Sequence, residues 1–162
     1  MKNPIPYGRQ SVTEEDIASV ADVLRSDFLT QGPVISKFED AFADYTGAQY
    51  AIALSNGTAA LHLGAIALGV NSSSRVITSP ITFSASANCV AYCGGQIQFA
   101  DIDPETFLLD STAVEKLLKD APEGTYDGII PVDFAGRSVN MEAFRELADR
   151  YNLWIMEDAC HA

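Results

Sequence analysis

The hydrophobic positions of this chain follow two different periods, which alternate from about residue 50 to the end. Short runs rich in Ile, Val and aromatic residues predict strands at 50–54, 75–79, 96–102, 128–134 and 153–157. Helical spacing between these runs predicts helices at 58–68, 84–93, 111–119 and 141–151. Strands and helices in this order predict an α/β fold, with a mostly parallel sheet and helices on both faces.

Two further helices are predicted ahead of the sheet. Thr13 and Asp16 have the spacing of a capping box, and apolar side chains then recur at helical spacing over 17–24. The second helix repeats apolar side chains over 35–45 and ends at Gly47, a residue type that often ends helices. The chain therefore starts with a helical segment before the sheet begins.

Composition and charge narrow the classes of function. The chain has 162 residues, of which 48% are hydrophobic and 20% charged, as in an ordinary globular domain or part of one. A formal net charge of -12, with only ten Lys and Arg, argues against nucleic-acid binding. A small anionic ligand stays compatible with this charge, because backbone amides at a helix N-terminus hold anions locally.

Neither a membrane segment nor a metal site is predicted. The longest mostly apolar stretch, 59–70, is too short to cross a bilayer, and the first residues lack the apolar core of a secretory signal. A cytoplasmic protein is therefore expected. Cys89, Cys93, Cys160 and His161 match no zinc-binding spacing, and we expect the three cysteines to be small buried side chains.

A ligand is expected at the carboxyl ends of the parallel strands, because the loops at these ends border one crevice. After the first predicted strand, Asn56, Gly57 and Thr58 open a helix, where free amides, hydroxyls and the positive end of the helix dipole meet. This arrangement is typical of a phosphate site, although it is neither G-x-G-x-x-G nor a Walker A loop. The alternative interpretation is a plain N-cap with a glycine for tight packing.

After the last predicted strand, Glu157 and Asp158 point to opposite sides of the chain. Asp158 at the mouth of an apolar sheet needs a cationic or donor partner, and the protonated ring nitrogen of a cofactor is one candidate. A helix N-cap and a metal-coordinating aspartate are the alternatives. Phe83 could cover a flat ring with its aromatic face, or it could belong to the core. His161 could donate a hydrogen bond to a ring hydroxyl, or it could make an ordinary polar contact.

Other catalytic patterns are missing or weak. The sequence contains no G-x-S-x-G, no H-E-x-x-H and no usable Cys-His pair, so hydrolase functions have no support. Asp101 and Asp103 are candidates for a paired-carboxylate site, but the following Pro104 favours a turn. His62, inside a helix between two leucines, is interpreted as structural.

Six blocks of sequence together resemble the sugar-nucleotide aminotransferases of the DegT/DnrJ/EryC1/StrS type, and the resemblance covers the whole chain. The blocks are I-P-Y-G at 5–8, L-T-Q-G-P at 29–33, A-L-S-N-G-T-A-A-L-H-L at 53–63, S-P-I-T-F at 79–83, I-I-P-V-D-F-A-G at 129–136 and E-D-A-C-H-A at 157–162. The subgroup it resembles most is that of the UDP-4-amino-4,6-dideoxy-N-acetyl-altrosamine transaminases of pseudaminic acid biosynthesis. The resemblance implies that residues 1–162 are the N-terminal part of the large domain of the aspartate-aminotransferase fold (fold type I), without the small C-terminal domain.

The resemblance also implies roles for individual residues. Those that would bind pyridoxal 5′-phosphate are Asn56, Gly57, Thr58, Phe83, Asp158 and His161. Gly57 and Thr58 would hold the phosphate, and Phe83 would stack on the ring. Asp158 would pair with the ring nitrogen and His161 would lie near the phenolic oxygen, and these two are the expected catalytic residues. The residues that would approach the nucleotide sugar are Tyr7, Gln31 and Gly32.

The implied activity is a ping-pong transfer of an amino group from glutamate to C4 of a nucleotide-linked 4-keto-6-deoxy sugar, carried out by a homodimer. In relatives, the lysine that holds the cofactor lies downstream of the E-D-A block. The lysines of this chain are Lys2, Lys37, Lys116 and Lys119, none of them at a strand end near Asp158. We therefore expect the full-length protein to be an enzyme and this chain alone to be inactive.

Three alternatives stay open at this point. One is a sugar dehydratase of the same family that uses the pyridoxamine form of the cofactor, with histidine in place of the lysine. Another is a non-catalytic nucleotide-sugar binding module of the same fold. The third is an unrelated flavodoxin-like or nucleotide-binding α/β domain. The sequence lacks the glycine fingerprint of such domains, which argues against this alternative. The sequence does not fix the sugar stereochemistry or the choice among UDP, dTDP and GDP.

Overall fold

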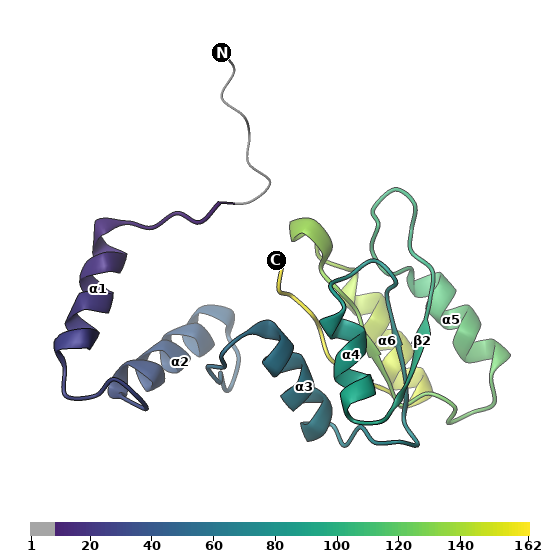
Figure 1. The fold of residues 1–162 in the computed structure, drawn as a ribbon. Helices are drawn as coiled ribbons and strands as arrows, with labels where there is room; N and C mark the ends of the chain where they lie inside the picture. The colour runs from purple at the N-terminus through teal and green to yellow at the C-terminus, as the bar shows by residue number, and fades with distance from the viewer. Residues whose placement is uncertain (1–8) are drawn as a thin grey trace, which may run out of the picture. The chain divides into compact units, whose positions relative to one another are not determined.

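A computed structural model describes residues 9–162 of the protein (Figure 1). The chain divides into two compact units, Met1–Ala53 and Leu54–Ala162. The described part of the first unit, residues 9–53, contains two helices and no strand, and the second unit contains the sheet. None of the helices among the described residues is both long and apolar enough to span a membrane.

The first unit consists of α1 (Glu14–Arg25) and α2 (Pro33–Thr46). The predicted capping box is present, since the Asp16 amide donates to Thr13 Oγ1 at 3.2 Å and the Thr13 amide donates to Asp16 Oδ2 at 2.7 Å. α2 starts with a proline at its first position and ends at Gly47, whose φ of 71° lies in the left-handed region that glycine favours. Both predicted helices are confirmed.

The strand predicted at 50–54 is wrong. Residues 51–54 form no strand and pair with none among the described residues, and the Ala53 amide donates instead to Glu39 Oε1 at 2.8 Å. A side chain of α2 thus satisfies a backbone donor that a neighbouring strand would otherwise satisfy. The short apolar run suggested a strand, but strand pairing also needs an adjacent strand.

The second unit is built on a parallel sheet with the strand order β2-β1-β3-β4. Its strands are β1 (Arg75–Thr78), β2 (Gln96–Phe99), β3 (Gly128–Ile130) and β4 (Trp154–Ile155). Val76 of β1 is in register with Ile97 of β2 on one side and with Gly128 of β3 on the other. The predictions of an α/β class and a parallel sheet are confirmed.

β3 is shorter than the predicted 128–134, for a local reason. Pro131 follows directly and has no amide hydrogen to donate to a neighbouring strand. The chain then makes a single bridge at Val132 and turns into a short 3₁₀ helix, η1 (Phe134–Gly136), in which Ala135 has a φ of 54°. The end of this segment is thereby bent toward the carboxyl edge of the sheet instead of continuing it.

The second unit has four described helices close to the predicted positions, one before β1 and three that join the strands. They are α3 (Gly57–Ala67), α4 (Ala85–Tyr92), α5 (Ser111–Asp120) and α6 (Met141–Tyr151). The predicted caps of the last two are present, since Asp110 Oδ1 accepts from the Thr112 amide at 2.8 Å and Asn140 Oδ1 from the Ala143 amide at 3.3 Å. The sequence thus placed the helix starts of this unit correctly to within a residue.

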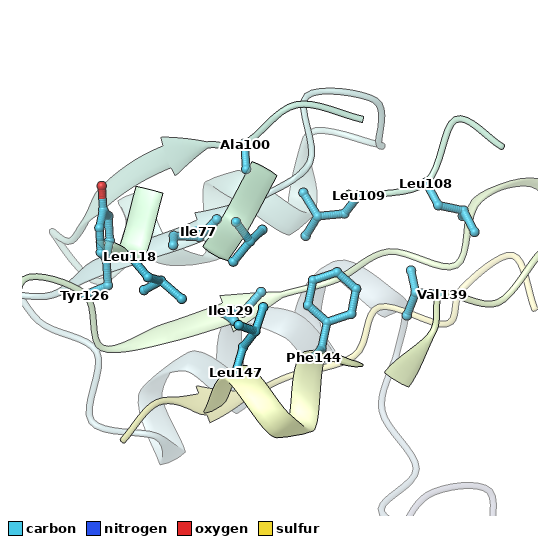
Figure 2. Packing of buried hydrophobic residues seen from close by; sticks show 11 residues of the cluster. Ile77, Ala100, Leu108, Leu109, Leu118, Tyr126, Ile129, Val139, Phe144 and Leu147 are labelled. Atoms are coloured by element: carbon cyan, nitrogen blue, oxygen red, sulfur yellow. The ribbon is translucent and has the colours of Figure 1, made fainter. Parts of the chain in front are cut away.

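Two apolar clusters cover the two faces of the sheet. Ile77 and Ile129, from neighbouring strands, pack with α5 and α6, and Figure 2 shows Phe144 and Leu147 of α6 beside Ile129. On the opposite face, Val76 and other buried side chains pack with α3 and α4. The helices therefore lie on both faces, as predicted, and the sheet holds its carboxyl-end loops on a rigid base.

Candidate active site

Asp158 is held at the carboxyl end of the sheet by backbone hydrogen bonds. It follows β4 and forms a parallel bridge with Val132. Its amide donates to the Pro131 carbonyl at 2.9 Å, and its own carbonyl accepts from the Asp133 amide at 3.0 Å. The residue is only 5% exposed. A buried carboxylate on such a fixed backbone needs donors around it, because burial without partners is costly.

The protein supplies donors to both carboxylate oxygens of Asp158. The hydroxyl of Ser86, in α4, donates to Oδ2 at 2.5 Å. The Cys160 amide donates to Oδ1 at 3.3 Å, and this local bond turns the chain after Asp158. Asp158 therefore caps no described helix. Among the described residues no group of His, Cys, Asp and Glu has the arrangement of a metal site.

The start of α3 has the form of an anion site. Asn56 is its N-cap, and Asn56 Oδ1 accepts from the Ala59 amide at 2.8 Å. The amides of Gly57 and Thr58 make no hydrogen bond among the described residues, so these donors are available at the positive end of the helix dipole. Both predictions from the sequence, a cap and a set of free amides, hold at the same place.

The start of α3 and the Asp158 loop lie next to each other. A Cβ atom added at Gly57 would lie 2.7 Å from Cys160 Sγ, which leaves no space for a side chain at this position. Cys160 in turn contacts Asp158 through its amide. The buried carboxylate and the free amides therefore border the same edge of the sheet, as the fold class requires.

A small hollow lies above Asp158. Its lining residues are Thr82, Phe83, Val132, Phe134, Asp158, Cys160 and His161. The hollow encloses about 20 Å³, room for no more than a water molecule, so a flat cofactor ring would lie over its mouth. Phe83 is 70% exposed at this mouth, and the His161 ring lies 6.2 Å from the Phe134 ring, with a tilt of 41°. The structure thus brings Phe83, Asp158 and His161 together.

The Asp158 carboxylate affects the pKa of the neighbouring Cys160 thiol. A hydrogen bond between the Cys160 thiol and this carboxylate, together with desolvation, raises the pKa of Cys160 to about 11. Burial raises the pKa of Cys89 to about 11 as well.

The expectation that all three cysteines are buried is wrong for Cys160, which is exposed, and Cys93 is half-buried. Cys160 is exposed because it leaves the sheet at the mouth of the site.

A second carboxyl group lies on the other side of the strand end. Desolvation, and then the nearby charge and hydrogen bond of Asp133, raise the pKa of Glu157 above its usual range. Asp133 is buried, and its Oδ1 accepts from the Val139 amide at 2.9 Å. Glu157 and Asp158 therefore occupy different surroundings, which agrees with their predicted opposite directions.

Three of the predicted site residues belong to the first unit of the chain. Tyr7 lies outside the described residues, and Gln31 and Gly32 belong to the first unit, so their approach to a nucleotide sugar stays a prediction. Asp103 forms the predicted turn, since its Oδ1 accepts from the amides of Glu105 and Thr106.

Two residues of the site were missed by the sequence interpretation. Ser86 and Thr82 lie beside Asp158, with their hydroxyl oxygens 2.6 Å apart. Both stand within a few residues of Phe83, but a serine in the first turn of a helix is common and gives no sign of a distant partner. Only the packing of α4 against the sheet brings Ser86 to Asp158.

A buried carboxylate, free helix-start amides and an exposed aromatic ring at one sheet edge are the features of a cofactor-dependent α/β enzyme. The model of the DegT/DnrJ/EryC1/StrS aminotransferase family matches residues 10–162. The chain belongs to this family. The prediction of pyridoxal phosphate chemistry is thereby confirmed at the level of the family, and the unrelated nucleotide-binding domain considered above is excluded.

Several relatives of the chain are described as sugar aminotransferases. A curated relative from Shewanella sediminis, described as UDP-4-amino-4-deoxy-L-arabinose–oxoglutarate aminotransferase, is 36% identical over 98% of this chain and 40% of its own length. The chain thus spans about 40% of the length of such curated relatives.

Solved structures confirm fold type I for the described part. NtdA from Bacillus subtilis, with the bound cofactor PMP, has a TM-score of 0.83 and 34% identity, covering 92% of this chain and 34% of that one. PseC from Helicobacter pylori, an aminotransferase involved in pseudaminic acid biosynthesis, has a TM-score of 0.84 and 30% identity, covering 97% of this chain and 42% of that one.

Proposed function

We propose that the complete protein is a pyridoxal-phosphate-dependent aminotransferase that moves an amino group from glutamate to C4 of a nucleotide-linked 4-keto-6-deoxy sugar. Residues 1–162 would form the N-terminal part of its cofactor-binding domain. The observation that carries the proposal is the buried Asp158 carboxylate next to the helix start with the free amides of Gly57 and Thr58, and the exposed Phe83 that lines the same hollow as Asp158.

The residues present fit this cofactor. The helix-start amides of Gly57 and Thr58 suit a phosphate, and Phe83 offers an aromatic face for a flat ring. Asp158 is the buried acceptor that a protonated ring nitrogen needs, and His161, which lines the same hollow, would serve a ring oxygen. When bound, the cofactor supplies an electron sink for the carbanion formed next to the transferred nitrogen.

Three residues of the site then have defined roles. With the cofactor bound, the buried Asp158 carboxylate would favour a proton on the ring nitrogen through its negative charge. Gly57 lets the Cys160 loop come close, because any side chain there would meet Sγ of Cys160. Asn56 fixes the helix start, so that the amides of Gly57 and Thr58 keep their direction.

The proposal also specifies the substrate of the complete protein. The name of the sugar aminotransferase from Shewanella sediminis supports a nucleotide-linked sugar aminated at C4, and the name of PseC supports the pseudaminic acid subgroup suggested by the sequence blocks. Glutamate as the amino donor and a homodimer are proposed with it. The cofactor-holding lysine would be supplied from beyond residue 162, so residues 1–162 alone would be inactive.

The test uses the complete protein with pyridoxal phosphate. Binding should give a visible absorbance band that disappears when glutamate is added and returns with a UDP-4-keto-6-deoxy-N-acetylhexosamine. dTDP- and GDP-linked ketosugars, offered in parallel, identify the nucleotide. A protein that binds the cofactor but never loses the band with glutamate contradicts transamination and supports the dehydratase. A protein that shows no cofactor band contradicts the proposal and supports a binding module.

A further inference from the structure

Ser86 is a completely buried hydroxyl for which the proposed function alone gives no task. It lies in the first turn of α4 and is 0% exposed. Its hydroxyl oxygen lies 2.5 Å from Asp158 Oδ2, across 72 residues of sequence. So short a distance is typical of a hydroxyl that donates to a charged oxygen.

The direction of this hydrogen bond follows from counting hydrogens. The Ser86 hydroxyl has one hydrogen and three acceptors within reach, Asp158 Oδ2 at 2.5 Å, Thr82 Oγ1 at 2.6 Å and the Phe83 carbonyl at 3.2 Å. An ionised carboxylate only accepts, whereas the Thr82 hydroxyl can donate, and the carboxylate is the closest and strongest acceptor, so the hydrogen lies toward Asp158.

Thr82 completes the chain of hydroxyls. Its Oγ1 lies 2.6 Å from the Ser86 oxygen, and with the Ser86 hydrogen committed to Asp158, Thr82 is the donor of this second bond. Hydrogen bonds in such a chain polarise one another and strengthen the last one. The Cys160 amide holds the other carboxylate oxygen, Oδ1, from a different direction.

We propose that Ser86 is a positioning residue that fixes the orientation of the Asp158 carboxylate and thereby sets the affinity of the site for the pyridine ring of the cofactor. With Oδ2 held by Ser86 and Oδ1 by the Cys160 amide, the carboxylate plane cannot turn about the side-chain axis without breaking one of the two bonds. This inference rests on the proposed function, because it gives Asp158 a ring nitrogen to face.

The first test is a binding measurement on the complete protein with pyridoxamine phosphate, which needs no bond to a lysine. Ser86→Ala should raise the dissociation constant about tenfold or more, the size expected for losing a hydrogen bond to a charged group. Thr78→Val is the matched control. Thr78 is equally buried and its hydroxyl donates to the Ile130 carbonyl at 2.8 Å, not to Asp158 or Ser86. Its dissociation constant should stay within about twofold of that of the wild type.

A double-mutant cycle separates positioning from a merely structural role. In an Asp158→Asn background, Ser86→Ala should weaken pyridoxamine phosphate binding by less than about threefold, because an amide oxygen gains less from the hydroxyl than a carboxylate does. An equal loss in both backgrounds overturns the proposal.

If the Asp158→Asn variant binds pyridoxamine phosphate too weakly to measure, the same double-mutant cycle is carried out on the free energy of unfolding, measured by urea unfolding of the cofactor-free protein. There Ser86→Ala should destabilise the wild type more than the Asp158→Asn variant, and additive effects again overturn the proposal. A wild-type protein that binds no pyridoxamine phosphate contradicts the proposed function together with this inference. Wild-type and Ser86→Ala proteins that bind equally well contradict this inference only.

Discussion

Gly57 is the residue at which two loops of the site approach most closely. Its missing side chain makes room for Cys160 Sγ, which would lie 2.7 Å from an added Cβ. The backbone of Gly57 is helical, so glycine is not needed there for its φ. Space alone therefore explains the glycine, and the prediction below tests this explanation.

Gly57→Ala should lower the free energy of unfolding by about 1 kcal/mol, because one methyl group is forced against a sulfur atom. Cys160→Ala removes this sulfur, and the double variant Gly57→Ala/Cys160→Ala should regain most of the loss. Urea unfolding of the four proteins measures both effects. A double variant whose losses simply add would show that the strain lies with another neighbour.

Cys160 should react slowly for an exposed thiol. Its hydrogen bond to Asp158 and its desolvation raise its pKa from the ordinary value of 9.0 to about 11, so at pH 8 the reactive thiolate is about 100-fold rarer than in an ordinary cysteine. Alkylation by iodoacetamide, followed by mass spectrometry of the Cys160 peptide, should accelerate steadily as the pH rises toward 11. Asp158→Asn removes the main cause and should speed alkylation at pH 8. Equal rates in both proteins would contradict the hydrogen bond.

At the scale of elements, the ends of β3 and β4 bring two carboxyl groups together. Desolvation and Asp133 raise the pKa of Glu157, so the folded state favours the protonated form of this side chain. The stabilising effect is complete below the unfolded value of 4.5 and is lost as the pH rises through the folded pKa. At neutral pH the ionised Glu157 is therefore a destabilising group.

Glu157→Gln should accordingly raise the free energy of unfolding at pH 7 and change it little near pH 4. Thermal unfolding at the two pH values measures the difference, and the variant Glu123→Gln, at an exposed site elsewhere, is the control. A stabilisation of the same size at both pH values would point to the amide's own contacts and not to the charge.

The helices and strands also show how far local sequence determines an element. The starts of α5 and α6 were predicted from Asp110 and Asn140, because a cap bonds to amides two or three residues away. The strand at 50–54 was predicted wrongly, because pairing depends on a strand elsewhere in the chain. β3 ended earlier than predicted at Pro131, and here the signal was present in the sequence.

At the scale of the whole molecule, the sheet of the second unit depends on its two apolar layers. Phe144 of α6 is 1% exposed in the cluster that contains Ile77 and Ile129 (Figure 2). This layer and the one formed with α3 and α4 fix the strands whose carboxyl ends carry the site. A substitution that disrupts the packing of this layer should therefore also weaken cofactor binding at the site.

Phe144→Ala should lower the free energy of unfolding by about 3–5 kcal/mol, because it leaves a large cavity in a close-packed layer. Since domains are stable by only about 5–15 kcal/mol, pyridoxal phosphate binding should weaken as well. Phe99→Ala, at a half-exposed position of β2, is the control and should cost less than a third as much. Urea unfolding and a cofactor titration measure the two effects. Equal losses would mean that the α6 layer does not hold the sheet together.

The sequence by itself determined the element types, most helix starts, the α/β class and the family, together with the candidate residues Asn56, Gly57, Thr58, Phe83, Asp158 and His161. These depend on spacings within a few residues or on blocks read along the chain. Only the tertiary structure decided that Ser86 donates to Asp158 and that Cys160 lies against Gly57. Such contacts join residues far apart in sequence, and their geometry is fixed by how helices pack on the sheet, which no local pattern records.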